Sequence, residues 1–202
     1  MFISLEGIEG AGKSTLANSL LDYFKAQNID TILTREPGGT PLAEVIRHTI
    51  LHSEPNEKLS HNAELLLMFA SRVQHIEQLI KPALAQNKLV ICDRFIDASY
   101  AYQGGGRGVS FAHINILENM LVGTLPNITL LLDLPLEAMV ARLKNAPKDK
   151  IEQENLDFFY NVRAAYLQRA KEDPTRIKII DASQPANIVF KQAVSLIKEQ
   201  VK

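Results

Sequence analysis

The chain has 202 residues, of which 46% are hydrophobic and 22% charged, which is the composition of one ordinary globular domain. Its formal net charge of -1, from 22 basic and 23 acidic residues, argues against a nonspecific nucleic-acid binder or a polybasic membrane protein. The single cysteine, the start without a signal-peptide pattern and the lack of a long apolar run argue against a disulfide-stapled or membrane-spanning fold, so we expect a cytoplasmic protein.

Short β-rich runs alternate with longer segments that carry apolar residues at helical spacing. This alternation predicts an α/β fold, with a mostly parallel five-stranded sheet and helices on both of its faces. Strands are expected at 2–6, 31–34, 89–92, 128–132 and 177–180. Helices are expected at 13–27, 41–51, 62–85, 111–122, 136–143, 153–171 and 186–199. No repeat or linker interrupts the pattern, so we expect a single domain over residues 1–202.

Two polar or glycine-rich segments interrupt these elements. Residues 103–108 read Gln-Gly-Gly-Gly-Arg-Gly, which can bring backbone close to a ligand because few side chains obstruct it. Residues 145–150 are polar and contain a proline. We expect each segment to be a moving part or a ligand loop, and the second to belong to a short lid at about 144–152.

The first loop carries the strongest motif in the chain. Gly7-Ile8-Glu9-Gly10-Ala11-Gly12-Lys13-Ser14 matches the phosphate-binding pattern G-x-x-x-x-G-K-[ST], between an expected strand and an expected helix. Backbone N–H groups of such a loop converge on phosphate oxygens, with the lysine at the β- and γ-phosphates and the serine hydroxyl on magnesium. The sequence therefore predicts ATP binding by Gly7, Gly10, Ala11, Gly12, Lys13, Ser14 and Thr15.

Charged residues follow another expected strand. Asp93 and Arg94 stand at its carboxyl end, where open α/β sheets bind ligands. Asp93 would hold magnesium or orient Arg94, although a carboxylate that only caps a turn is an alternative. The guanine-reading Asn-Lys-x-Asp and the switch Asp-x-x-Gly of GTPases do not occur. A kinase of a small phosphorylated acceptor fits better, because arginines also lie near other element ends, at Arg35, Arg47, Arg72, Arg107 and Arg142.

Several motifs in the same order give a specific resemblance. Together with the phosphate-binding loop, Arg35-Glu36-Pro37-Gly38-Gly39-Thr40, Asp93-Arg94 and residues 101–108 (Ala-Tyr-Gln-Gly-Gly-Gly-Arg-Gly) make the chain resemble bacterial thymidylate kinases. The resemblance implies a P-loop fold and transfer of the γ-phosphoryl group of ATP to dTMP, with magnesium, giving dTDP and ADP. It also implies a homodimer.

The resemblance assigns roles to individual residues. It implies that Arg94 and Arg47 hold the dTMP phosphate, that Glu9 accepts from the sugar 3′-hydroxyl, and that Tyr102 presses on C2′ and so selects deoxyribonucleotides. It implies a thymine site whose residues include Arg72 as a donor to a base carbonyl, Ser99 and Gln103 as hydrogen-bonding groups, and Glu36 and Pro37 from the second motif. Either Met68 or Phe69 would stack on the base, since both share a helical face with Arg72.

The lid departs from the family's pattern. The P-loop has no arginine, and the lid segment carries lysines where arginines are expected, so we hypothesise that Lys150 together with Arg142 supplies the catalytic charge, alongside Lys13, Glu9 and Arg94. Gln184 stands in a loop that resembles the one flanking adenine. Arg107 is open to two interpretations, a phosphate ligand or a solvated side chain.

Two other functions stay open at this point. One is a kinase for another nucleotide or for deoxynucleosides. The other is a nucleotide-sensing module with an inactive lid.

Overall fold

A five-stranded parallel sheet forms the centre of the molecule. The computed structural model describes residues 1–52, 59–144 and 154–200. The strands are β1 (Phe2–Glu6), β2 (Thr31–Arg35), β3 (Leu89–Asp93), β4 (Ile128–Asp133) and β5 (Ile177–Asp181). They pair in the order β2-β3-β1-β4-β5, and every neighbouring pair is parallel. The predicted fold class is confirmed. Each of the last four strands runs one residue further than predicted. The prediction ended each strand with its apolar run, whereas the strand includes the charged residue that follows that run.

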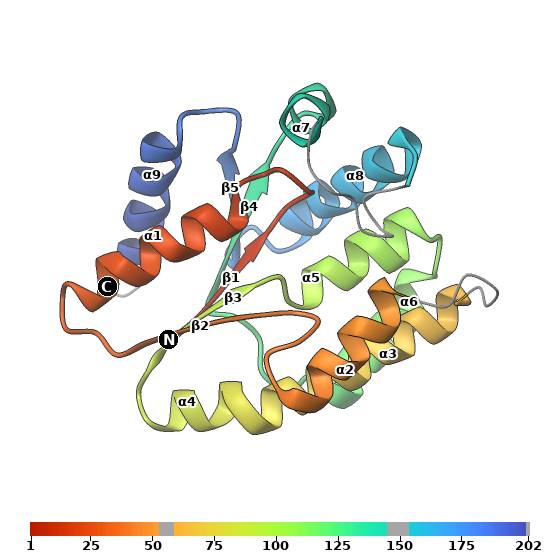
Figure 1. The fold of residues 1–202 in the computed structure, drawn as a ribbon, viewed down its shortest axis with the longest axis horizontal. Helices are drawn as coiled ribbons and strands as arrows, with labels where there is room; N and C mark the ends of the chain where they lie inside the picture. Colours follow the sequence, from red (N-terminus) through yellow and green to blue (C-terminus); the bar gives the residue numbers. More distant parts are fainter. Residues whose placement is uncertain (53–58, 145–153, 201–202) are drawn as a thin grey trace.

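Helices cover both faces of this sheet (Figure 1). Helices α1 and α9 pack together beside one face, and α4, α5 and α8 lie against the other. The helices are α1 (Lys13–Lys25), α2 (Pro41–Leu51), α3 (His61–His75), α4 (Lys81–Ala85), α5 (Ile96–Ser99), α6 (Phe111–Leu121), α7 (Leu136–Leu143), α8 (Leu156–Glu172) and α9 (Ala186–Glu199), with two π-helical segments, η1 (Ile76–Ile80) and η2 (Tyr100–Gly106).

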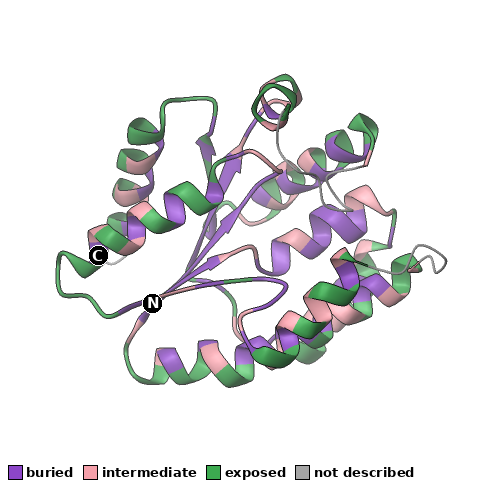
Figure 2. Ribbon diagram, viewed as in Figure 1, coloured by how far each residue is buried: buried purple, intermediate pink, exposed green. Residues whose placement is uncertain are grey.

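The central strand supplies both hydrophobic cores. Ile3 and Leu5 are fully buried with residues of α1 and α9, whereas Phe2 is buried with residues of α3, η1 and β3. This follows from the alternation of side chains along a strand. Figure 2 shows the central strands β1, β3 and β4 buried along nearly their whole length, the edge strands β2 and β5 partly exposed, and the helices exposed on their outer faces. β1 is therefore held on both sides, which fixes the loop that follows it.

One long helix was predicted over residues 62–85, and the structure divides it. The chain is α-helical in α3, widens to a π-helix in η1 and returns to an α-helix in α4. Pro82 lies in this second α-helix. Proline has no N–H to donate and its ring crowds the preceding turn, which accounts for the wider turn just before it. The prediction of a helical segment was right, but the prediction of one regular α-helix was wrong.

The expectation of a moving part or a ligand loop at 103–108 was wrong for most of that segment. Gly104, Gly105 and Gly106 belong to η2, which packs against α8. A Cβ on Gly105 would lie 2.7 Å from both the Asn161 carbonyl oxygen and the Ala165 Cβ. These glycines therefore allow close helix packing, which the sequence alone does not distinguish from a flexible loop.

Because the strands are parallel, the segments that follow them meet at one edge of the sheet. The P-loop follows β1, Glu36 follows β2, and Arg94 follows β3. Open α/β sheets bind their ligands at this edge, beside the strands whose order reverses.

Candidate active site

The P-loop joins β1 to α1 in a conformation that depends on glycine. Gly10 and Gly12 have φ values of 70° and 89°, which L side chains rarely adopt. No acidic residue lies in the first turn of α1, and the positive end of a helix attracts anions. The loop therefore suits an anionic ligand.

The Lys13 ammonium is folded back under this loop. Its Nζ donates to the carbonyl oxygens of Gly7 at 3.0 Å and Ile8 at 2.9 Å, and the residue is 8% exposed. Burial, and next the positive charge of Arg94, lower the pKa of Lys13 to about 8. A phosphate group bound in the loop would stabilise the charged form of Lys13, because its negative charge would replace the water that the buried ammonium has lost.

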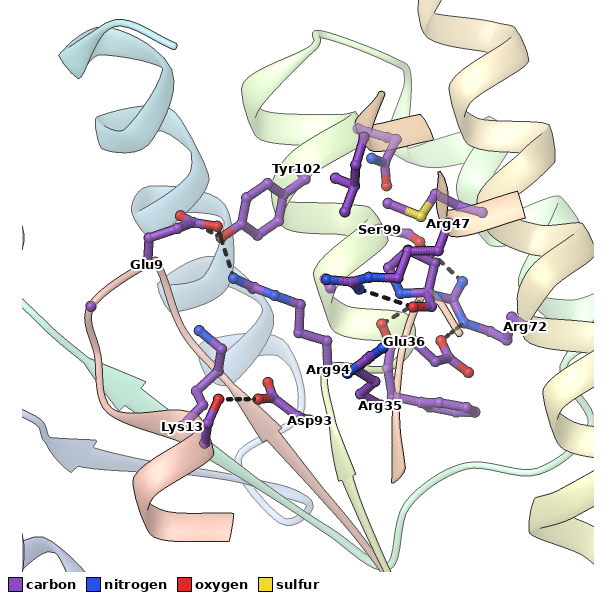
Figure 3. A pocket seen from close by; sticks show the side chains of 18 residues that line it. Glu9, Lys13, Arg35, Glu36, Arg47, Arg72, Asp93, Arg94, Ser99 and Tyr102 are labelled. Atoms are coloured by element: carbon purple, nitrogen blue, oxygen red, sulfur yellow. Dashed lines mark hydrogen bonds and ion pairs between the residues drawn. The ribbon is translucent and has the colours of Figure 1, made fainter. Parts of the chain in front are cut away.

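Ser14 and Asp93 lie together beside Lys13. The Ser14 Oγ donates to Asp93 Oδ2 at 2.9 Å, which links the first turn of α1 to the end of β3 (Figure 3). A hydroxyl and a carboxylate are hard oxygen ligands of the kind that magnesium prefers, and magnesium takes its other ligands from phosphates and water. The two residues predicted to hold magnesium are thus adjacent. Among residues 1–52, 59–144 and 154–200, no cluster of three or more His, Cys, Asp or Glu side chains forms a metal site.

Arg94 occupies the centre of the site. Its Nη2 donates to Glu9 Oε1 at 2.9 Å, and its Nη1 donates to the Gly7 carbonyl oxygen at 2.9 Å and to the Tyr166 hydroxyl at 3.2 Å. Its guanidinium carbon also lies 4.6 Å from the centre of the Tyr102 ring. These contacts orient the guanidinium between the P-loop and η2 (Figure 3).

Behind Arg94 lies the carboxyl group of Glu6, the last residue of β1. Glu6 Oε1 accepts from the Phe95 backbone N–H and Oε2 accepts from the Tyr166 hydroxyl, both at 2.7 Å. Burial and the negative charge of Asp97 raise the pKa of Glu6 to about 8. Glu6 thus fixes the position of Arg94 in two ways: it binds the backbone N–H of the next residue, Phe95, and it binds the Tyr166 hydroxyl that contacts Arg94. The sequence analysis missed both Glu6 and Tyr166.

A cavity of about 360 Å³ opens beside Arg94. Ten of the eleven residues predicted to bind the acceptor line it: Glu9, Glu36, Pro37, Arg47, Met68, Arg72, Arg94, Ser99, Tyr102 and Gln103. Lys13, Ser14 and Asp93 line it as well, so phosphate-binding groups and this cavity are continuous. The predicted residues come from segments that lie far apart in the sequence, and the fold brings them together.

A buried ion-pair network forms one wall of this cavity. Glu36 accepts from Arg72 Nε at 2.7 Å, and its other oxygen lies 3.0 Å from His75 Nδ1. The His75 Nε2 lies 2.8 Å from Thr34 Oγ1, and Arg72 Nη1 donates to Ser99 Oγ at 3.0 Å. Glu36 therefore orients the Arg72 side chain through this ion pair. His75 was missed, although it stands three residues after Arg72 on the same helix.

Of the two candidates for stacking on a base, only Met68 lines the cavity. Phe69 is 1% exposed and belongs to the core under α3, where the Arg72 guanidinium carbon lies 5.0 Å from its ring centre. The inclusion of Phe69 among the ligand-binding residues was therefore wrong. One step along an α-helix turns a side chain by about 100°, enough to move it from the cavity to the core.

A second cavity of about 290 Å³ lies beside the P-loop and α9. It is lined by predicted ATP-binding residues, namely Gly10, Ala11, Gly12, Thr15, Arg142 and Gln184, and by an apolar wall that was not predicted, from Ala186, Val189 and Phe190. The amphipathic start of α9 was the signal for that wall. The Arg142 guanidinium donates to the carbonyl oxygens of Gly10 at 2.9 Å and Ala182 at 2.8 Å, so it links the P-loop to the loop after β5.

Arg107 fits neither of its two interpretations. It forms ion pairs with Glu64, at 3.4 Å, and with Glu154, and its guanidinium carbon lies 4.8 Å from the Phe158 ring centre. It is therefore a partly buried structural cation that follows η2. Lys150 and residues 145–152 of the expected lid lie outside the described residues.

The described residues include no helix with the length and apolar character needed to cross a membrane.

The fold and its two cavities define a class of enzyme. A parallel sheet whose first strand leads into a P-loop, with one cavity on each side of that loop and arginines on the acceptor side, belongs to a P-loop nucleoside monophosphate kinase. A family model described as thymidylate kinase matches residues 5–193. The chain belongs to the thymidylate kinase family.

Individual relatives agree with this assignment. A thymidylate kinase of Acinetobacter baylyi is 48% identical over 202 residues, which cover 100% of both chains. A thymidylate kinase of Pseudomonas savastanoi pv. phaseolicola is 52% identical over 187 residues, covering 92% of this chain and 89% of that protein. The crystal structure of thymidylate kinase from Ehrlichia chaffeensis superposes with a TM-score of 0.78 at 33% identity, covering 98% of each chain.

Proposed function

We propose that this chain transfers the γ-phosphoryl group of ATP to dTMP and releases dTDP and ADP. The observation that carries the proposal is that Gly10 lines both cavities. A donor in the α9-side cavity and an acceptor beside Arg94 would then meet across the P-loop. Phosphoryl transfer depends mainly on such positioning and on neutralised charge, since the protein forms no covalent intermediate.

The proposed reaction is a direct displacement. An oxygen of the dTMP phosphate forms a bond to the γ-phosphorus while the bond from that phosphorus to the β–γ bridging oxygen breaks, and ADP leaves with the electron pair. Lys13 would move from its carbonyl partners to the β- and γ-phosphates. Arg94 and Arg47, which line the acceptor cavity, would hold the dTMP phosphate against the repulsion of the ATP phosphates.

The oxygen atoms of Ser14 and Asp93 suit a magnesium ion. Ser14 Oγ and Asp93 would hold it, directly or through water, because they are adjacent oxygen ligands beside Lys13. Magnesium would supply positive charge that screens the phosphates during transfer.

The rest of the cavity supports recognition of a deoxyribonucleotide. Tyr102 and Glu9 lie side by side, and would contact the sugar at C2′ and at the 3′-hydroxyl. Met68, Arg72 and Ser99 would surround the base. Gln103 contributes a buried carbonyl oxygen with no hydrogen-bond partner among the described residues, which would accept the N3–H of thymine.

We also propose that the chain works as a homodimer, through an apolar face on α2, α3 and α6. Exposed apolar side chains on these helices are Leu42, Val45, Leu66, Ile116 and Met120, the last with 73% of its surface exposed. Helix α3 packs against both α2 and α6, which supports one continuous face. Such a face favours association because burying it removes apolar area from water. Met120→Glu should give a monomer in light scattering, whereas Ile188→Glu on α9 should not; a dimer in both would contradict this interface.

Two predictions rest on the sequence alone. Lys150 would add catalytic charge together with Arg142, so that Lys150→Ala would lower kcat more than it raises the KM for dTMP. A cytoplasmic location rests on the single cysteine, which suits a reducing compartment.

The deciding experiment measures ADP release with ATP and four acceptors: dTMP, dUMP, dCMP and thymidine. We expect dTMP to give the highest kcat/KM and thymidine, which has no phosphate for Arg94, to give none. Arg94→Met should lower kcat/KM for dTMP by about 100-fold or more. The matched control is Arg163→Met, which removes an ion-paired arginine that lines neither cavity. Turnover of thymidine would identify a nucleoside kinase, and ATP binding without transfer would identify a binding module.

A further inference from the structure

The amide of Gln103 is only half paired. Gln103 lines the acceptor cavity and is 1% exposed. Its Nε2 donates to Glu64 Oε1 at 2.9 Å, whereas its Oε1 is buried and accepts from no group among the described residues. A buried acceptor without a donor carries a free-energy penalty that a ligand with a suitably placed donor relieves.

The charges next to Gln103 determine which end of its amide faces the cavity. Glu64 is 5% exposed, and the Arg107 Nε lies 3.5 Å from its Oε1 and 3.4 Å from its Oε2. A guanidinium can only donate hydrogen bonds, and an ionised carboxylate can only accept them. The Gln103 NH₂ must therefore face Glu64, and its carbonyl oxygen is left for the cavity.

We propose that Glu64, held by Arg107, is a positioning residue that determines base specificity by fixing the polarity of the Gln103 amide. In that orientation Gln103 favours a pyrimidine with a hydrogen on N3, as in thymine, and opposes a cytosine-type base, whose N3 is itself an acceptor. This inference rests on the proposed function, which places the base beside Gln103. It assigns a role to Glu64 and Arg107 although neither lines the cavity.

The chain of donors and acceptors predicts the effect of one substitution. In Glu64→Gln, the acceptor-only carboxylate becomes an amide, which presents an oxygen or an NH₂ to Gln103, and Arg107 lies about equally far from both positions. Gln103 is then no longer held with its carbonyl oxygen toward the base. One change outside the cavity would thus release the hydrogen-bonding character of a group inside it.

The test compares kcat/KM for dTMP and for 5-methyl-dCMP, which differ at N3 and at position 4 of the ring. For Glu64→Gln we expect the ratio of dTMP to 5-methyl-dCMP to fall by about tenfold or more, because one misplaced buried hydrogen bond has that effect. The ratio need not invert, since Arg72 still favours a carbonyl at position 4. Glu118→Gln is the matched control: this carboxylate accepts from the Tyr100 hydroxyl outside the cavity, and its loss should leave the ratio unchanged.

A second variant keeps the test decisive. If Glu64→Gln does not fold, Glu64→Ala replaces it; the Gln103 amide then has no carboxylate to face, and the ratio should fall as well. A folded variant at position 64 that keeps the wild-type ratio within about twofold would overturn the inference.

A separate variant tests the base site itself. Gln103→Leu removes both amide groups and should lower kcat/KM for dTMP. An unchanged value there would mean that the base does not contact Gln103, which is a failure of the proposed base site. A lowered value together with an unchanged ratio in the Glu64 variants is a failure of the role of Glu64 alone.

Discussion

The Tyr102 hydroxyl donates to both oxygens of the Glu9 carboxylate, at 2.8 Å and 2.9 Å. A ring from η2 is thereby tied to a carboxylate of the P-loop, and the same carboxylate accepts from Arg94. Burial and the adjacent negative charge of Glu9 raise the pKa of Tyr102 well above its ordinary value, with Arg94 opposing them, so the phenol keeps the hydrogen that it donates. The position of the ring depends on this bond and on its stacking with Arg94.

The ring and its hydroxyl can be tested apart. Tyr102→Ala should reduce the preference for dTMP over ribothymidine 5′-monophosphate, because space opens beside C2′. Tyr102→Phe should keep most of that preference, since the ring remains, but should raise the KM for dTMP because Glu9 loses a donor. Steady-state kinetics with both nucleotides measure this. An alanine variant with the wild-type preference would show that Tyr102 does not select the sugar.

Asp93→Asn should raise the magnesium concentration needed for half-maximal activity by about tenfold or more. The amide can still accept from Ser14 Oγ, but it has no negative charge to offer a cation. A titration of activity with magnesium at fixed ATP measures the effect. Asp133→Asn is the control, because Asp133 ends β4 and pairs with Arg163. Equal magnesium requirements in the wild type and in Asp93→Asn would contradict the assignment of Asp93.

The lowered pKa of Lys13 predicts a pH dependence in ATP binding. Lys13 loses its charge as the pH rises through about 8, so kcat/KM for ATP should fall there, because it reports the free enzyme. Once ATP is bound, its phosphates stabilise the charged amine, and kcat should fall only at higher pH. Lys13→Met should show no inflection near pH 8 and turn over at least about 100-fold more slowly. A kcat/KM profile that stays flat well above pH 8 would contradict this prediction.

Glu6 predicts a pH dependence in stability. Its pKa is about 8 in the folded protein against an ordinary value of 4.5, so between these values the folded state binds more protons than the unfolded state. Stability from this group therefore falls as the pH rises through that window. Glu6→Gln cannot ionise, and its free energy of unfolding should depend less on pH. Urea unfolding at several pH values across the window measures this free energy for both proteins. The same dependence on pH in the wild type and in Glu6→Gln would argue against the raised pKa.

The elements that the sequence predicts well are those encoded locally. The five strands are short apolar runs, the P-loop is a fixed pattern of glycines and one lysine, and Asp93-Arg94 ends a strand whose burial is evident from its composition. Since parallel strands end at one edge, these local features suffice to place Lys13, Asp93 and Arg94 near one another.

The remaining contacts depend on side chains that meet only after folding. Arg107 pairs with Glu64 from α3 and with Glu154 from the segment before α8, and no local pattern relates these positions. Met68 and Phe69 differ by one step on a helix whose facing direction the sequence does not define. The glycines of η2 allow a loop or a close helix contact equally well, and only the position of α8 decides between them.

That contact has a consequence for drug resistance. Gly105 approaches Ala165 and Asn161 of α8 so closely that even a methyl group would not fit, and Tyr102 and Gln103 stand on the same π-helical segment. A larger residue at position 165, such as in Ala165→Val, would push η2 and with it the residues proposed to contact sugar and base. Substitutions that weaken an inhibitor of the acceptor cavity are therefore expected on α8, behind the cavity wall, as well as among the residues that touch the inhibitor.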